Sequence, residues 1–410
     1  MLTLEKFEEA SEIVKRVTRP TKLIYSEYLS SQTGGKVYLK PENMQYTGAY
    51  KLRGAYYKIS TLSEEDRAKG LITASAGNHA QGVAYAAKAF GCKATIVMPT
   101  VTPLIKVNRT KSYGAEVVLH GDVYDDACAK AYELAEEYGY TFVHPFDDLD
   151  VATGQGSIAM EIFDELPDVD YILAPIGGGG LASGIGSFYK QMSPKTKIIG
   201  VEPAGAAGMK KSFECGEVTE LNEVDKFVDG AAVQRVGELT YAICKKVLDD
   251  IVVVPEGKIC TTILNLYNFD AIVVEPAGAL SMSALDFYKN EIKGKNVVCV
   301  VSGSNNDITR MEDIKERYLL YEGLKHYFVV RFPQRAGALQ SFVSNVLGPH
   351  DDITYFEYKK KTNREKGPAL IGIEIQHPED FQGLLDRMKS EGILYEYLND
   401  NPNLFEFLIG

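Results

Sequence analysis

Short runs of β-branched residues alternate with longer stretches of helical period from residue 36 to about residue 305. The runs end in Gly, Ser or Pro, and we place them at residues 36–41, 71–75, 94–99, 116–121, 171–177, 197–203, 251–255 and 296–303. Apolar runs of this kind that are joined by helices are typical of parallel strands with helical crossovers. The pattern therefore predicts an α/β fold with twisted, mostly parallel sheets, in which ligands bind at the carboxyl ends of the strands.

A different pattern follows residue 308. Residues 309–324 are predicted to form a charged connecting helix. Residues 325–410 follow the order βαββαβ, which is typical of a small ferredoxin-like α+β module. Its strands are predicted at residues 327–332, 353–359, 369–376 and 394–398, and its helices at 337–347 and 379–391. Polar and apolar residues alternate along 353–359, which predicts a sheet with one covered face. We expect one domain over residues 1–308, with a smaller lobe at roughly 40–150, and a second over 325–410.

Charge and cysteine usage exclude several classes of protein. The formal net charge is −12 and no basic block offsets it, which argues against nucleic acid and membrane partners. The N-terminus lacks the plan of a signal peptide, and no apolar run is long enough to span a bilayer. The six cysteines and six histidines are scattered, which predicts free thiols and no metal site. We therefore expect a cytoplasmic protein.

Lys51 is the first candidate for chemistry. It follows Gly48 and Ala49, and such small residues let a flat ring approach a lysine without obstruction. A lysine amine that is buried loses its proton more easily and can then bind an aldehyde covalently. A solvent-exposed lysine is the ordinary alternative. Together with the two motifs described next, Lys51 predicts pyridoxal 5'-phosphate as cofactor, which needs an amine for its aldehyde and amides for its phosphate.

A glycine-rich loop joins the strand at 171–177 to a helix. Its residues are Gly177, Gly178, Gly179, Gly180 and Leu181. Consecutive backbone N–H groups at a helix start can bind one phosphate group. The loop also fits the dinucleotide pattern G-x-G-x-x-A, with Ala182 last and Glu202 about 20 residues further on. An NAD-dependent dehydrogenase is therefore an alternative, but it leaves Lys51 without a role.

Two further strand ends carry polar residues. The first has the sequence Ser75-Ala76-Gly77-Asn78-His79, and its backbone N–H groups could bind a substrate carboxylate. Asn78 could bind the cofactor's phenolic oxygen, although Ser75 or Asn78 could instead cap the following helix. The second strand ends at Ser302, whose hydroxyl could face the cofactor's ring nitrogen. A neutral partner there makes the ring a weaker electron sink, which favours elimination over transamination.

These motifs, in this order, resemble the threonine dehydratase (threonine ammonia-lyase) family of the fold type II pyridoxal-phosphate enzymes, over about residues 5–410. The resemblance implies a two-lobed fold in which Lys51 carries the cofactor, Asn78 and Ser302 contact its ring, and residues 177–181 hold its phosphate. It implies β-elimination of L-threonine, with L-serine as secondary substrate, to 2-oxobutanoate and ammonia in isoleucine biosynthesis. The alternatives are a catabolic serine/threonine dehydratase, another fold type II lyase, or an amino-acid sensor built on an inactive enzyme.

The C-terminal module resembles the ACT-like regulatory domain of the biosynthetic enzyme. The likeness lies in Phe332-Pro333-Gln334-Arg335-Ala336-Gly337 and in Asn401-Pro402-Asn403-Leu404. It implies feedback inhibition by isoleucine, with valine as a second candidate effector, in a homotetramer. A purely structural dimerisation module is the alternative.

Racemase-like relatives bear on whether a cation is bound. Glu202 and the carbonyl of Ala206 resemble two ligands of their divalent-cation site, but Gly208 replaces the third carboxylate. No bound divalent ion is therefore expected, and a monovalent cation is left open. Serine racemases also carry Ser at the position of Ala76, and alanine cannot donate the proton that racemisation needs.

Overall fold

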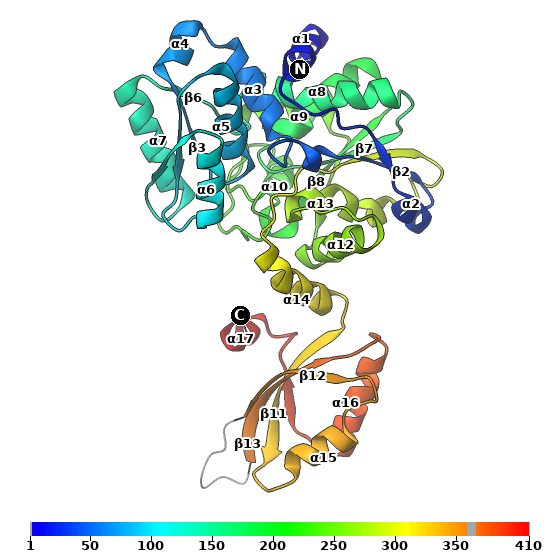
Figure 1. Cartoon of the computed structure of the whole chain (residues 1–410). Coiled ribbons are helices and arrows are strands. Elements are labelled where there is room, and N and C mark those ends of the chain that lie inside the picture. The colour runs from blue at the N-terminus through cyan, green and yellow to red at the C-terminus, as the bar shows by residue number, and fades with distance from the viewer. Residues whose placement is uncertain (1, 359–365, 410) are drawn as a thin grey trace. The chain divides into compact units, whose positions relative to one another are not determined.

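The chain divides into two units, Met1–Asp307 and Ile308–Gly410. The computed structural model describes residues 2–358 and 366–409 (Figure 1). Among these residues, we find no helix that has both the length and the apolar character needed to cross a membrane.

The larger sheet of the first unit has six strands. Their order is β1(Ile24–Tyr25), β2(Lys36–Lys40), β10(Asn296–Val300), β7(Tyr171–Pro175), β8(Lys197–Pro203) and β9(Asp250–Val254). Every neighbouring pair is parallel except β1 and β2. The helices around this sheet are α1(Leu4–Val14), α2(Glu27–Thr33), α8(Leu149–Glu165), α9(Gly180–Met192), α10(Gly208–Cys215), α11(Glu238–Val247), α12(Glu256–Phe269) and α13(Pro276–Ser283). In Figure 1, α8 and α9 lie on one side of the sheet and α12 and α13 on the other.

The smaller lobe has a four-stranded parallel sheet. Its order is β5(Glu116–Leu119), β4(Ala94–Met98), β3(Leu71–Ala74) and β6(Thr141–Phe142). Its helices are α3(Lys51–Thr61), α4(Glu64–Lys69), α5(Asn78–Phe90), α6(Leu104–Ser112) and α7(Tyr124–Tyr138). Strands β3 and β4 are buried along their whole length, as expected for parallel strands covered by helices on both faces. The predicted α/β plan with mostly parallel sheets is confirmed.

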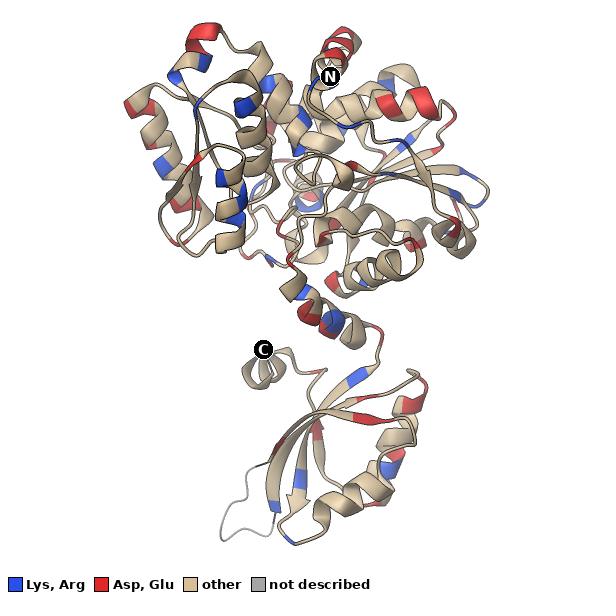
Figure 2. Cartoon of the chain, in the orientation of Figure 1, with Lys and Arg blue, Asp and Glu red and all other residues tan. Residues whose placement is uncertain are grey.

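The second unit begins with α14(Met311–Tyr321), on which acidic and basic residues are interspersed (Figure 2). Its sheet is antiparallel, in the order β12(Asp352–Tyr358), β13(Lys366–Glu374), β11(Lys325–Pro333) and β14(Tyr395–Tyr397). Its other helices are α15(Ala338–Asn345), α16(Asp380–Ser390) and α17(Pro402–Leu408). The order βαββαβ is confirmed, and α17 follows it.

The prediction of a sheet with one covered face is confirmed, because Phe328 and Ile371 are buried in one cluster with Phe342 of α15 and Leu384 of α16. Most side chains of β12 itself are nevertheless exposed. Tyr355, Phe356 and Tyr358 are 38%, 40% and 37% exposed, although they point to both faces of β12. The reason is position, because β12 lies at the edge of its sheet and pairs only with β13. Position 359 lies outside the described residues.

Candidate active site

Lys51 is the first residue of α3, and its side chain is partly buried. Its Nζ atom donates a hydrogen bond to the carbonyl oxygen of Pro145, at 2.7 Å. Burial lowers the pKa of the Lys51 ammonium group to about 8, because a charged group loses favourable solvation when it leaves water. The amine is therefore much easier to deprotonate than an exposed lysine.

Backbone contacts hold the segment before Lys51 against the residues that follow β10. The N–H of Tyr50 donates to the carbonyl of Ser302 (3.1 Å), and the N–H of Ser304 donates to that of Gly48 (2.9 Å). Gly48 has φ +71°, and a Cβ atom there would lie 2.5 Å from Asn305 Oδ1. The structure thus brings two motifs about 250 residues apart in the sequence into direct contact.

The glycine loop lies between β7 and the start of α9. Gly179 occupies the left-handed region, with φ +94°, and Thr240 Oγ1 donates to the carbonyl of Gly178 at 2.6 Å. A Cβ atom at Gly178 would overlap the ring of Phe146. The first N–H groups of a helix have no intrahelical partner and attract anions. The loop and the start of α9 therefore offer backbone N–H groups to an anion such as phosphate.

Residues 143–148 join Lys51 to this loop. Pro145 accepts from the lysine amine, and the next residue, Phe146, packs over Gly178. Asp147 then caps α11, where its Oδ1 accepts from the N–H groups of Leu239 (2.9 Å) and Thr240 (3.1 Å). The sequence does not predict the role of this segment, because a backbone carbonyl carries no signal of residue type. Pro145, Asp147 and Asp148 indicate a turn here, but they do not predict a contact with Lys51.

Residues 75–79 join β3 to α5. Ser75, Ala76, Gly77 and Asn78 are partly exposed. Gly77 holds the N-cap position and no side chain caps the helix, so the alternative of capping by Ser75 or Asn78 is wrong.

His79 differs from its four neighbours because it is buried. Its Nε2 lies 2.9 Å from the carbonyl of Val143, and burial lowers its pKa to about 3. The ring is therefore neutral at physiological pH, and its contact is to backbone rather than toward the exposed side of the turn.

Ser302 lies two residues beyond the end of β10 and is 3% exposed. Its hydroxyl donates to the carbonyl of Ala277 at 3.0 Å. The hydroxyl oxygen therefore keeps its lone pairs and can accept a hydrogen bond from a ligand.

Two buried carboxylates belong to a hexapeptide that occurs twice. Val-Glu-Pro-Ala-Gly-Ala stands at residues 201–206 and again at 274–279, and the second copy was not identified from sequence. Burial raises the pKa of Glu202 and of Glu275 to about 7. Glu202 accepts from the N–H groups of Met209 (2.7 Å) and Lys210 (2.8 Å) at the start of α10. Glu275 instead accepts from Asn78 Nδ2 at 2.6 Å. The repeat was the signal that could have identified Glu275.

A buried ion cluster lies behind Lys51. Arg53 is fully buried and donates to both carboxylate oxygens of Glu42 and of Glu161, at 2.6 to 2.9 Å. Lys40, also fully buried, donates to Glu161 at 2.6 Å. The cluster anchors the first turn of α3, from which Lys51 projects.

The residues present fit pyridoxal phosphate. Lys51 offers an amine of lowered pKa, and the N-terminus of α9 offers N–H groups to a phosphate. The glycine loop adds no side chain of its own at the start of that helix, and Phe146 of the segment that holds Lys51 packs directly over Gly178. In the described part of the chain, no group of three or more His, Cys, Asp or Glu residues could hold a metal ion.

Two family models match the chain. Residues 14–303 match the pyridoxal-phosphate dependent enzyme family, and residues 316–408 match the C-terminal regulatory domain of threonine dehydratase. The dehydrogenase alternative is therefore wrong. In a dinucleotide site of this pattern, the acidic residue about 20 positions on binds the ribose, but both carboxylate oxygens of Glu202 already accept N–H groups from the start of α10.

Three relatives illustrate the likeness. The chain is 52% identical over 412 residues to L-threonine dehydratase biosynthetic IlvA of Halalkalibacterium halodurans, covering 100% of this chain and 99% of the relative. Among solved structures, processed threonine deaminase isoform 2 of Solanum lycopersicum has TM-score 0.73 and 41% identity, covering 77% of this chain and 89% of that one. The threonine deaminase of T.th. has TM-score 0.71 and 36% identity, covering 75% of this chain and 99% of that one. The chain therefore belongs to the biosynthetic L-threonine dehydratase family of the fold type II pyridoxal-phosphate-dependent enzymes.

Proposed function

We propose that the chain catalyses pyridoxal-phosphate-dependent β-elimination of L-threonine to 2-oxobutanoate and ammonia, the first step of isoleucine biosynthesis, with L-serine as a slower substrate. The main support is identity of 52% to a biosynthetic L-threonine dehydratase over the full length. The contact between Lys51 and the segment that covers the glycine loop adds support from the site itself. We also propose a cytoplasmic location.

Each site residue has a proposed role. When bound, the cofactor withdraws electrons from the substrate's Cα and so makes its proton acidic. Lys51 holds the cofactor and then, as a free amine, takes that proton. The start of α9 with residues 177–181 neutralises the phosphate. Asn78 and Ser302 hold the ring, and the N–H groups of residues 75–79 bind the substrate carboxylate.

The division of labour along the chain is also a proposal. Residues 1–308 catalyse, with a smaller lobe at roughly 40–150. Residues 309–324 connect, and residues 325–410 regulate. The two family matches, at residues 14–303 and 316–408, support this division.

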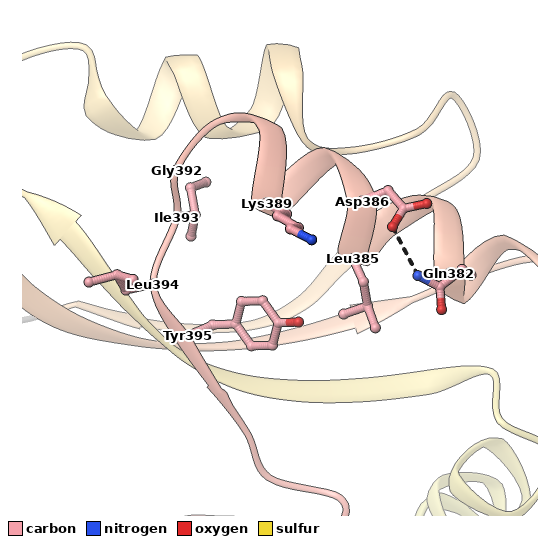
Figure 3. Close-up of a pocket in the computed structure, with 8 residues that line it drawn as sticks. All are labelled: Gln382, Leu385, Asp386, Lys389, Gly392, Ile393, Leu394 and Tyr395. Atoms are coloured by element: carbon pink, nitrogen blue, oxygen red, sulfur yellow. Dashed lines mark hydrogen bonds between the residues drawn. The ribbon is translucent and has the colours of Figure 1, made fainter.

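We propose that isoleucine binds the regulatory unit and inhibits, with valine as an opposing effector. This unit contains a hollow of about 370 Å³ between the end of α16 and the start of β14. Leu385, Ile393 and Tyr395 line it beside Lys389 and Asp386, and Gln382 donates to Asp386 at 2.9 Å (Figure 3). Apolar side chains beside an ammonium and a carboxylate group suit an amino acid with a branched side chain.

One experiment tests catalysis and regulation together. The keto acid formed from threonine and from serine is measured against isoleucine concentration, for the full chain and for a chain that ends at Glu322. The full chain should prefer threonine and lose activity as isoleucine rises, whereas the shorter chain should stay active and insensitive. The T.th. relative is about this length, which supports folding of the shorter chain. Equal isoleucine sensitivity of both chains would refute the effector site, and no keto acid from either would favour the sensor alternative.

We propose that the chain assembles as a homotetramer. The exposed aromatic residues on edge strand β12 support self-association, because an edge strand offers unpaired N–H and C=O groups to another chain. The masses in solution of the full chain and of the chain that ends at Glu322 test this proposal. The full chain should have about four times the mass of one chain, and a monomeric full chain would contradict the proposal.

The surroundings of Glu202 bear on which kind of cation, monovalent or divalent, the chain could bind. Both of its carboxylate oxygens accept N–H groups from the start of α10, and Gly208 brings no side chain. This arrangement favours carbonyl ligands such as Ala206 and a weakly held monovalent cation over a divalent one.

The lowered pKa of Lys51 predicts how the cofactor-free protein takes up the cofactor. The neutral amine is the nucleophile, so the rate should rise about tenfold per pH unit below pH 8 and level off above it. An ordinary exposed lysine would keep rising to about pH 10.4. Stopped-flow absorbance after mixing with pyridoxal phosphate measures the rate, and a simple alkyl amine serves as control. A rate that still climbs between pH 8.5 and 10 would contradict the assignment.

A further inference from the structure

Glu275 is a buried carboxylate beside the candidate site. It occupies the N-cap position of α13, yet its side chain makes no capping hydrogen bond to that helix. Its Oε1 accepts from Asn78 Nδ2 (2.6 Å), and its Oε2 accepts from the N–H of Asn305 (3.1 Å). Glu202, the matching residue of the other hexapeptide, has both oxygens on the start of a helix. Glu275 therefore acts on Asn78 and Asn305 rather than as a cap.

The contacts of Asn78 form a closed ring. Asn305 Nδ2 donates to Asn78 Oδ1 at 2.6 Å and to the carbonyl of Thr47 at 2.8 Å. The carbonyl of Thr47 can only accept, so Asn305 turns its NH₂ group toward Thr47 and Asn78. Asn78 must then turn its oxygen toward Asn305 and its NH₂ group toward Glu275. The side-chain amide then has one N–H left for a ligand, in a direction set by its two partners.

The space around the carboxylate is filled by backbone. A Cβ atom at Gly303 would overlap Glu275 Oε1, and one at Gly230 would lie 3.3 Å from the same atom. Glu275 is 4% exposed. The carboxylate therefore cannot swing to another partner, and neither can the amide that it holds.

We propose that Glu275 is a positioning residue that presents the remaining N–H of Asn78, and not its carbonyl oxygen, to the cofactor's ring oxygen. The inference rests on the proposed cofactor binding. Glu275 touches neither cofactor nor substrate in this role and acts through Asn78. A carbonyl oxygen turned to that ring oxygen would repel it, whereas an N–H stabilises its ionised form.

Glu275→Gln tests the proposal in the full chain loaded with pyridoxal phosphate. Asn78 and Asn305 donate to different oxygens of Glu275. Glutamine replaces one of these oxygens with an NH₂ group, so it cannot accept from both in the same arrangement. We expect the cofactor's absorption maximum, or its pH dependence, to shift, and kcat/KM for threonine to fall about tenfold.

Asp249→Asn is the matched control. Asp249 accepts one backbone N–H, from Ile198 (2.9 Å), and side-chain N–H groups from Lys190 (2.9 Å) and Lys197 (3.2 Å), at the start of β8 and away from the strand ends that carry the site. It should lower stability and leave the spectrum unchanged.

The outcomes separate this inference from the proposed function. A wild-type chain that shows no cofactor absorption sinks the proposed function. A wild-type chain that absorbs, with Glu275→Gln unchanged in spectrum and reduced only in stability like the control, overturns the positioning role. If Glu275→Gln does not fold, Asn305→Ala decides, because it removes the donor to Asn78 Oδ1 and leaves the carboxylate in place. A shift in the cofactor spectrum of Asn305→Ala supports the positioning of Asn78 by its two hydrogen-bond partners, and an unchanged spectrum overturns it.

Discussion

Lys51→Ala is expected to lower threonine turnover by at least ~10³-fold, because it removes both the covalent anchor and the proposed base. The near-visible absorption of the bound cofactor should disappear with it. The amine lies 2.7 Å from the carbonyl of Pro145, beside the segment that covers the glycine loop. Keto acid formation and the absorption spectrum of the purified protein measure the two effects.

Lys58→Ala provides the comparison for this change. Lys58 lies on the same helix but pairs with Asp148 and Asp150, at 2.8 and 3.1 Å. It should cost some stability and keep both the spectrum and most of the turnover. A Lys51 variant that retains turnover and absorption would move the active site elsewhere.

Arg53→Leu is expected to lower the free energy of unfolding by about 3–5 kcal/mol, because it leaves buried carboxylates without their cation. Glu42 is fully buried, and in this cluster its charge is balanced by Arg53. Glu161 keeps its ion pair with Lys40, so the loss of Arg53 should destabilise it less than Glu42. Denaturant-induced unfolding of the full chain measures the loss.

An arginine-to-leucine substitution at an exposed ion pair is the control for Arg53→Leu. It shows how much of the stability loss depends on burial of the ion pair. Arg235 pairs with Glu238 at 2.6 Å, with side chains 47% and 64% exposed. Arg235→Leu should change stability by less than about 1 kcal/mol, since surface ion pairs contribute little. Equal losses for the two variants would show that the buried cluster does not anchor α3.

The parts of the fold that sequence predicts are those with a local signal. Buried parallel strands are nearly continuous apolar runs, and each strand predicted in the first unit is present within a few residues of its expected bounds. Strands β1 and β6 have two residues each and leave no such signal. The rule that ligands bind at strand ends brought residues 75–79, the glycine loop and Ser302 into one hypothesis with Lys51. In the structure, the N–H of Tyr50, next to Lys51, donates to the carbonyl of Ser302. Pro145 accepts from the Lys51 amine, and its neighbour Phe146 packs over Gly178 of the glycine loop.

The missed features depend on contacts between distant segments. The carbonyl of Pro145 accepts a hydrogen bond from the Lys51 amine. Every residue has a backbone carbonyl, so the residue type cannot predict this contact. Glu275 has no cue in the sequence beyond the repeated hexapeptide, because its bonds to Asn78 and Asn305 form only when residues about 200 and 30 positions away come together. The exposure of β12 had no cue, because alternation along a strand cannot reveal that its neighbour on one side is missing.

The ring of Phe146 over Gly178 affects how the glycine-rich loop is interpreted in other sequences. Aromatic packing alone forbids a side chain there, so selection would retain glycine at this position even in a descendant that had lost all affinity for the vitamin. A pseudoenzyme of this lineage would keep the hallmark while lacking the chemistry. Loss of activity in such a lineage would therefore appear first at the lysine and at the hydroxyl after β10, and last in the glycines.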